Sequence, residues 1–342
     1  MSYHSALTAA DFHPDTRRFF AGQRVLVLGG SGFIGSHVTE ALLALDARPI
    51  VLSRHARPAF LAHLTGRIEC LQGTMDNAAL LERTMRDVRV VLHLAAAVGG
   101  IAWNAAHPAT MFMDNMALFT QALRAAAATR VERFLVTSSA CVYPRHCTVP
   151  TPEEEGFSGH PEPTNAGYGW AKRMEEFLAG AAVQEFGLSM AIARPYNAYG
   201  PRDNFDAVSS HVIAALIRKA VEATDGRFPV WGDGSHSRGF LYVDDFVRGL
   251  LEVAARYAKA DPVNIGPSEE VTIREVADQI ANTVGERLGK HLQPEFEPAG
   301  LTGQPRRACD TGKAFSLLGY QARVKMDDGL RQTIDWYLST CI

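Results

Sequence analysis

Short apolar runs alternate with longer amphipathic stretches through the first part of the chain. The runs are rich in Val, Ile and Leu, which is typical of strands that are covered on both faces of a sheet. The predicted strands are 24–28, 49–52, 68–71, 88–94, 134–137 and 190–193. Helical patterns lie between them, notably at 113–128 and 168–183. This alternation predicts an α/β fold with a doubly wound parallel sheet.

The pattern changes after Pro195. Gly and Pro become frequent at 199–201 and 231–234, and shorter helical patterns follow at 273–284 and 326–338. We expect a smaller, mixed α/β lobe here. The predicted division is an N-terminal extension at 1–22, a sheet domain at 23–195 and a second lobe at 196–342, with a soft boundary that the chain can cross back over. The extension fits neither lobe, so it packs either on the surface or on a partner subunit.

Composition narrows the class of protein. The chain has 342 residues, of which 47% are hydrophobic and 21% charged, with a net charge of −3. This balance argues against nucleic acid or a membrane surface as a partner. No apolar run reaches the ~18 residues of a membrane span. The five cysteines are scattered without metal-binding spacing, so we expect no metal and a reducing, cytoplasmic location.

Three glycines follow the first strand and precede a helix. Gly29, Gly32 and Gly35 are spaced as in dinucleotide-binding turns, where glycine permits a tight turn and close approach of a pyrophosphate. The first amides of the helix, at Phe33 and Ile34, would then face the phosphates. The sequence therefore predicts a Rossmann-like dinucleotide-binding domain at 23–195.

In dinucleotide-binding domains, residues at the end of the second strand contact the cofactor ribose and so distinguish NAD from NADP. An acidic residue there favours NAD, whereas a basic residue accommodates the 2′-phosphate of NADP. The stretch 52–57 contains Arg54 and Arg57 but no acid. NADP(H) is therefore favoured, with NAD(H) as the alternative if these arginines are only solvated surface charges.

Tyr168 and Lys172 lie four residues apart, about one helical turn. An ammonium group beside a phenol favours the phenolate and so lowers the pKa of the tyrosine from its usual ~10. We expect this pair to exchange a proton with an alcohol or sugar oxygen while hydride moves.

Several ordered motifs together resemble the extended short-chain dehydrogenase/reductases of the NAD-dependent epimerase/dehydratase family. Beyond the glycines and Tyr168-x-x-x-Lys172, they are 93–96, 138–139, 194–201, 240–245 and 263–266. The resemblance implies that Ser139, Tyr168 and Lys172 form the catalytic set. It also implies cofactor contacts from Leu94, Ala95, Ala96, Pro195, Tyr168 and Lys172.

Within this group, the stretches 98–101, 139–144, 203–205 and 210–213 resemble the GDP-L-fucose synthase family. That family epimerises a GDP-4-keto-6-deoxyhexose at C3 and C5 and reduces C4 with NADPH. The resemblance assigns the epimerisation pair to Cys141 and His211. A thiol and an imidazole, with reference pKa values of ~8.5 and ~6.5, suit exchange of the acidic protons beside a ketone. The alternative is that Cys141 is an inert buried cysteine and His211 a loop residue.

The resemblance also implies residues that hold the nucleotide-diphosphate sugar. They are Asn197, Val212, Lys219, Trp231, Arg238 and Arg306. The alternatives are that Trp231 belongs to the core and Arg306 to a surface ion pair.

Two departures leave other reactions open. Ser31 occupies the position of a glycine-loop arginine in the fucose synthase family, and the C-terminal half resembles the GDP-mannose 3,5-epimerase family, which is redox-neutral and retains NAD. A sugar-nucleotide dehydratase is less favoured, because Ala140 and Cys141 stand where dehydratases carry Asp-Glu. A non-catalytic nucleotide-binding protein is also less favoured. The helices at 113–128 and 168–183 are expected to pair in a homodimer, as in the resembled family.

Overall fold

Seven parallel strands form the central sheet in the order β11-β6-β5-β4-β1-β2-β3. The computed structural model describes residues 5–298 and 303–341. The strands of this sheet are β1 (Arg24–Leu28), β2 (Arg48–Ser53), β3 (Glu69–Gln72), β4 (Val90–His93), β5 (Arg133–Thr137), β6 (Met190–Pro195) and β11 (Pro262–Ile265). The six predicted strands are present. The seventh, β11, lies beyond the predicted boundary at residue 195 and pairs in parallel with β6.

Helices cover both faces of the sheet, which confirms the doubly wound architecture. One face packs against α3 (Ala78–Met85), α5 (Pro108–Thr129) and α6 (Ala166–Phe186). The other face packs against α2 (Phe33–Ala44) and α8 (Val243–Arg256). Successive side chains of β1 point to opposite faces of the sheet. Leu26 and Leu28 pack in the core under α3, α5 and α6, and Val25 and Val27 pack in the core under α2 and α8.

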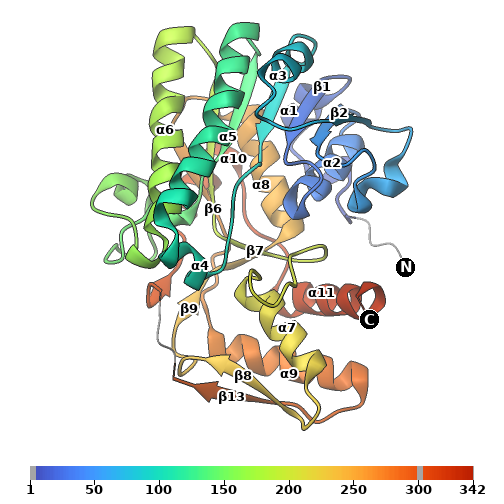
Figure 1. Ribbon diagram of the computed structural model, residues 1–342, viewed down its shortest axis with the longest axis vertical. Coiled ribbons are helices and arrows are strands. Elements are labelled where there is room, and N and C mark those ends of the chain that lie inside the picture. The colour runs from blue at the N-terminus through green and yellow to red at the C-terminus, as the bar shows by residue number, and fades with distance from the viewer. Residues whose placement is uncertain (1–4, 299–302, 342) are drawn as a thin grey trace.

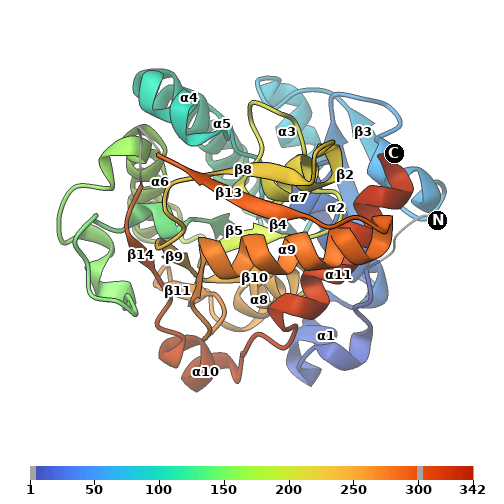
Figure 2. The same cartoon turned by 90° about the horizontal axis from the view of Figure 1, so that it is seen from below.

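The smaller lobe lies below the sheet and is built of helices and short paired strands (Figures 1 and 2). Its helices are α7 (Val212–Glu222), α9 (Ile273–Leu288) and α11 (Met326–Thr340). Its strand pairings are β7 (Asn197–Tyr199) with β10 (Phe240–Tyr242), β8 (Arg227–Trp231) with β13 (Gln293–Glu297), and β9 (Ser237–Arg238) with both β12 (Val271–Thr272) and β14 (Arg306–Arg307). The remaining helices are α1 (Pro14–Phe20), α4 (Ile101–Ala106) and α10 (Gly312–Leu318), with 3₁₀ turns at Ala9–Asp11, Ala59–Leu64, Ala140–Val142, Glu153–Phe157 and Pro163–Asn165.

Helices α5 and α6 extend beyond their predicted ranges at both ends, whereas α9 and α11 begin as predicted and extend only at their C-terminal ends. Helix α5 begins at Pro108, because proline fits the first helical position. Helix α6 ends before Gly187, which adopts a left-handed conformation with φ of 67°. Within the described residues, no helix combines the length and apolar character that a membrane crossing requires.

The N-terminal extension packs on its own chain over the part that the structure describes. Phe12 and Phe20 are buried in the core beneath α8. Thr16 donates a hydrogen bond to Glu252 on α8 at 2.7 Å, and the backbone N–H of Ser5 donates to Glu40 on α2 at 2.9 Å. Residues 5–22 therefore anchor the outer helices of the sheet domain, and residues 1–4 lie outside the described range.

Candidate active site

The glycine turn between β1 and α2 has the geometry that a dinucleotide requires. Gly29 has φ of +83°, and a Cβ there would lie 2.8 Å from the backbone nitrogen of Ala95. A Cβ at Gly35 would lie 2.1 Å from the carbonyl oxygen of Gly29. At Gly32, by contrast, an added Cβ would meet no atom nearer than the carbonyl oxygen of Gly29, at 3.5 Å. The protein itself leaves room at Gly32, which fits the close approach of a pyrophosphate.

The first turn of α2 supplies donors at this turn. Gly32 caps the helix without a side-chain hydrogen bond, so the amides of Phe33 and Ile34 point out of the helix start. Leu94 donates its backbone N–H to Leu28 at 2.9 Å, which brings the segment after β4 against the glycine turn.

The other predicted cofactor contacts occupy the same edge of the sheet. Ala95 lies directly against Gly29, and Ala96 follows it in the chain. Pro195 ends β6 and is buried. Carboxyl ends of parallel strands meet at one edge, so these residues and the glycine turn share a single cofactor-binding edge.

Arg54 and Arg57 follow β2 and are both exposed. Among residues 5–298 and 303–341, no carboxylate lies within ion-pair distance of either guanidinium group. Ser53 accepts the backbone N–H of His55 at 3.1 Å, which shapes this turn. Two cations and no acid therefore stand beyond the end of β2, where a cofactor ribose is read.

Ser139, Tyr168 and Lys172 come together from β5 and α6. Ser139 follows β5, and its hydroxyl acts on the phenol of Tyr168 in the direction that lowers the phenol pKa. Lys172 lies one turn after Tyr168, with its Nζ 5.5 Å from the centre of the phenol ring. The expected placement on one helix face is present.

Lys172 does not bring the pKa of Tyr168 toward neutrality in this structure, contrary to the sequence-based expectation. Burial raises the pKa of Tyr168 to about 12, and the opposing effect of Lys172 is smaller. Lys172 Nζ also donates to both carboxylate oxygens of Glu175, at 2.9 and 3.1 Å, and to the carbonyl of Thr137 at 3.0 Å. The ammonium charge is therefore shared with an acid that the sequence reasoning missed.

Glu175 is fully buried, and burial raises its pKa to about 7 although Lys172 acts in the opposite direction. The neighbouring Glu176 is engaged separately, in a two-fold hydrogen bond with Arg194. The signal that could have revealed Glu175 is its position three residues after Lys172, which places the two side chains side by side on a helix.

Cys141 lies two residues after Ser139, in the 3₁₀ turn at Ala140–Val142. Its Sγ accepts a hydrogen bond from Asn165 Nδ2 at 3.0 Å and from Arg307 Nη1 at 3.7 Å. The thiol is half-buried. A half-buried thiol beside a cation and an amide donor fits the electropositive, partly exposed surroundings that cysteine reactivity needs.

His211 caps α7 and its side chain is exposed. Neighbouring protein atoms still desolvate the imidazole enough to lower the pKa of His211. Among the described residues no hydrogen bond joins it to Cys141. Its loop nevertheless reaches the catalytic side, because a Cβ at Gly100 would lie 3.0 Å from the carbonyl oxygen of Val208.

Two arginines on adjacent short strands stand near Cys141. Arg238 on β9 and Arg307 on β14 are paired residues in the strand register. Burial, together with the like charge of Arg307, lowers the pKa of Arg238 to about 10. Two cations held side by side favour an anionic ligand between them.

Arg306 occupies a different place from its neighbour. It forms an ion pair with Glu270 at 2.6 Å on the protein surface. Successive side chains in a strand point to opposite faces. Because Arg307 points toward Cys141, Arg306 points away from Cys141. The sequence analysis named Arg306 and not Arg307, because a strand of two residues has no pattern from which the faces could be assigned.

The remaining predicted substrate residues lie on the smaller lobe. Asn197 Nδ2 donates to the carbonyl of Gly239 at 2.9 Å, and Val212 begins α7. The Trp231 side chain is 66% exposed, so it does not belong to the core. Lys219 Nζ lies 5.0 Å from the Trp231 ring centre and donates to Pro229 at 3.0 Å. Burial lowers the pKa of Lys219.

A seven-stranded parallel sheet with a glycine turn and a Ser-Tyr-Lys set at one edge defines a nicotinamide-dependent oxidoreductase or epimerase. The chain belongs to the NAD dependent epimerase/dehydratase family, whose model matches residues 25–266. It is therefore an NAD(P)-dependent enzyme.

Relatives within the family narrow the comparison. The chain is 33% identical to probable GDP-L-fucose synthase 1 of Oryza sativa subsp. japonica over 98% of each chain. It is 31% identical to GDP-mannose 3,5-epimerase 1 of Oryza sativa subsp. indica, covering 92% of this chain and 81% of the relative. The UDP-glucose 4-epimerase of Thermotoga maritima has a similar structure, with a TM-score of 0.82, 26% identity and coverage of 93% of this chain and all of that one.

Proposed function

We propose that this enzyme epimerises and reduces a GDP-linked 4-keto-6-deoxyhexose, with proton exchange at C3 and C5 and NADPH-dependent reduction at C4. One observation carries the proposal. Cys141 is hydrogen-bonded to Asn165 and lies near Arg307, and its turn also holds Ser139, whose hydroxyl acts to lower the pKa of Tyr168. A proton-exchange group and a hydride-transfer set are thus adjacent.

The exchange half uses the acidity of protons beside the C4 ketone. Cys141 as thiolate removes a proton from the carbon beside the carbonyl, and the electron pair moves onto O4 as an enolate. His211, as imidazolium, returns a proton to the opposite face. Burial lowers the pKa of His211, so its imidazolium is a stronger acid than a free one once the ring has taken up a proton.

The reduction half places a proton on O4. NADPH, when bound at the glycine turn, supplies the hydride for C4. Ser139 hydrogen-bonds O4 and Tyr168 donates its phenolic proton there. A pKa of about 12 keeps Tyr168 protonated at neutral pH, as a proton donor must be. Lys172, with its Nζ 5.5 Å from the Tyr168 ring centre, would turn its ammonium group to the cofactor ribose when the cofactor binds.

The preference for NADPH is supported by the exposed Arg54 and Arg57 beyond β2, which suit a 2′-phosphate. We assign the substrate diphosphate to Arg238 and Arg307, with Asn197 beside Gly239 and Lys219 on α7 as further contacts. Trp231, exposed beside Lys219, offers a face for the nucleotide base.

A redox-neutral epimerase that retains NAD is the second candidate. The similarity to GDP-mannose 3,5-epimerase 1 and the serine at position 31 favour it. Cofactor released from denatured, freshly purified protein separates the two proposals. Bound NAD would support the redox-neutral enzyme, and weakly bound or NADP cofactor the reductase.

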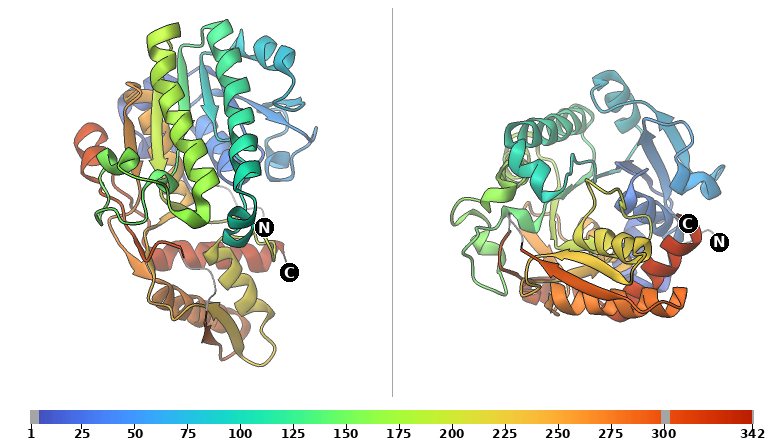
Figure 3. Two further views of the ribbon diagram at one scale, coloured as in Figure 1. Left: turned by 60° about the vertical axis from the view of Figure 1, so that its left-hand side comes forward. Right: turned by 60° about the horizontal axis from the view of Figure 1, so that its bottom comes forward.

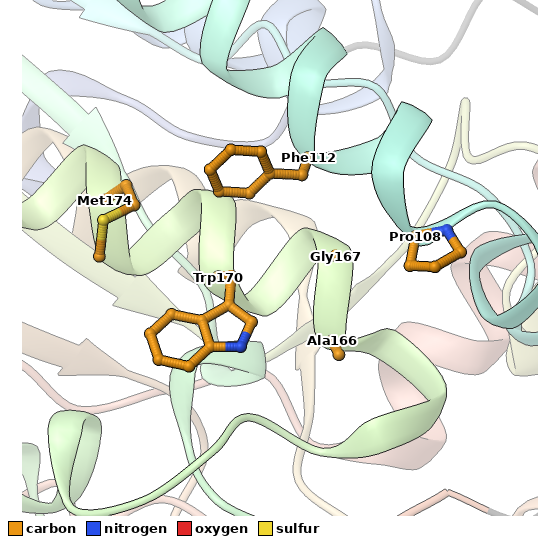
Figure 4. A pocket seen from close by; sticks show the side chains of 6 residues that line it. All are labelled: Pro108, Phe112, Ala166, Gly167, Trp170 and Met174. Carbon is orange, nitrogen blue, oxygen red and sulfur yellow. The ribbon is translucent and has the colours of Figure 1, made fainter.

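We further propose a homodimer formed through α5 and α6, which lie side by side along one face (Figure 3). Met113 and Phe177 on these helices are 60% and 62% exposed. A hollow between the helices is lined by Pro108, Phe112, Gly167, Trp170 and Met174 (Figure 4). Large exposed apolar side chains clustered on paired helices are typical of subunit interfaces.

Paired variants test the assignment of the two half-reactions. Cys141→Ser should slow deuterium exchange at the carbons beside the ketone by about 10²-fold or more, because the base is removed. Tyr168→Phe should slow NADPH oxidation by a similar factor and leave deuterium exchange in place. Equal loss of both half-reactions in both variants would contradict separate roles.

A further inference from the structure

The thiol of Cys141 ends a chain of hydrogen bonds that begins on α4. Asn104 Nδ2 donates to Asn165 Oδ1 at 2.8 Å, and Asn165 Nδ2 donates to Cys141 Sγ at 3.0 Å. Asn165 lies three residues before Tyr168, so the chain of bonds joins α4 to the catalytic turn at the start of α6.

The direction of these bonds matters for the sulfur. Because Asn104 donates to the Asn165 carbonyl, Asn165 has only its N–H groups to offer to the sulfur. A donor stabilises a thiolate over a thiol, whereas a carbonyl oxygen in the same place would favour the thiol. The observed orientation of Asn165 thus presents a donor, and not an acceptor, to the sulfur of Cys141.

This arrangement costs free energy elsewhere. Asn104 is 8% exposed, and its Oδ1 has no hydrogen-bond partner among the residues that the structure describes. An unsatisfied buried acceptor costs about 1–3 kcal/mol. The space beside it depends on Gly99, where a Cβ would lie 2.8 Å from Asn104 Oδ1. An apolar side chain at position 104 would avoid this cost, so packing does not explain the asparagine.

We propose that Asn165 is a positioning residue that holds Cys141 as a thiolate, and that Asn104 fixes the amide of Asn165 with its N–H toward the sulfur. This inference rests on the proposed role of Cys141 in proton exchange. It also gives a function to Gly99, because a side chain there would collide with Asn104 Oδ1.

Alkylation of Cys141 by iodoacetamide across pH tests the proposal directly. The tryptic peptide from Phe134 to Arg145 contains only Cys141, so mass spectrometry reads this thiol alone and the peptide with Cys147 serves as an internal control. Asn165→Ala should move the alkylation midpoint upward by about one pH unit, which is a tenfold lower thiolate fraction below the midpoint. Asn165→Asp should move it further, because a carboxylate would face the thiolate.

Asn104→Asp tests the second step without touching the sulfur. A carboxylate cannot donate to Asn165, so the Asn165 amide should turn and the Cys141 midpoint should rise. Asn282→Ala, an exposed change on α9, is the matched control and should leave the midpoint in place. Midpoints that stay at the wild-type value in Asn165→Ala and Asn104→Asp would overturn the proposal. If either Asn165→Ala or Asn104→Asp fails to fold, the midpoint of the other variant still tests the proposal.

Deuterium exchange separates this inference from the proposed function. If Cys141→Ser retains exchange, the proposed function fails, whereas the alkylation midpoints still decide the role of Asn165. If Cys141→Ser abolishes exchange, Asn165→Ala should slow exchange about tenfold at neutral pH. Full exchange in Asn165→Ala with an unshifted midpoint would overturn the positioning role.

Discussion

At the scale of single residues, the structure changes the account of the lysine. The spacing of Tyr168 and Lys172 predicted proximity correctly, but the pKa of Tyr168 also depends on burial, which spacing does not show. Glu175 holds the same ammonium from the opposite side at 2.9 Å. The ammonium group of Lys172 thus interacts with both the phenol of Tyr168 and the carboxylate of Glu175.

Glu175→Gln should move the alkaline limb of the reductase kcat profile to lower pH by about one unit or more. The glutamine removes the counter-charge of a buried ammonium, so the pKa of Lys172 falls. While Lys172 remains charged, its undivided charge lowers the pKa of Tyr168. Both effects reduce the protonated groups that reduction requires as pH rises.

Glu185→Gln, on the exposed side of the same helix, is the control and should keep the wild-type profile. The kcat of NADPH oxidation is measured at saturating substrate between pH 6 and pH 10. An alkaline limb that is unchanged or displaced upward in Glu175→Gln would show that the carboxylate does not influence this pair.

At the scale of elements, contiguous motifs were predictable and through-space contacts were not. The glycine turn follows from strand, turn and helix in immediate succession, and Gly29 lies against Ala95 as that geometry demands. Asn165 and Arg307 were missed because their importance depends on which side chains meet across the fold. A strand of two residues also shows no alternation, so the faces of Arg306 and Arg307 could not be assigned from sequence.

Arg307→Met should weaken substrate binding by about 10-fold to 100-fold, because a hydrogen bond to a charged group contributes roughly 1.5–3 kcal/mol. Arg306→Met should change KM less than about threefold, since an exposed ion pair contributes little. Steady-state kinetics with the sugar nucleotide distinguish the two. A larger effect at Arg306 than at Arg307 would reverse the assignment of faces on β14.

At the scale of the whole molecule, the sheet domain and the smaller lobe meet at the proposed site, and α5 and α6 form a separate apolar face. The positions of the six predicted strands along the chain and the change of pattern after Pro195 could be predicted from the sequence, but the order of the strands in the sheet was not predicted. Strand β11, by which the chain returns to the sheet, was not predicted, because the four residues at Pro262–Ile265 are too few to show a periodic pattern. The position of Phe177 on the outer face likewise required the packed structure.

Phe177→Glu should convert the proposed dimer to a monomer, because a charge would be buried in an apolar interface. Phe315→Glu makes the same chemical change at a side chain on α10 that is 55% exposed, and it should keep the dimer. Sedimentation velocity reads both variants against the wild type. If the wild type is monomeric, or if the dimer persists in Phe177→Glu, the proposed interface through α5 and α6 is wrong.

The central claim is that one site exchanges protons beside the ketone and then reduces it. The most direct measurement is incubation of the wild-type enzyme with the GDP-linked 4-keto-6-deoxyhexose and NADPH in deuterated water, followed by NMR of the product. The account predicts deuterium at C3 and C5 and one NADPH consumed for each product formed. A reduced product with no deuterium at either carbon would contradict it.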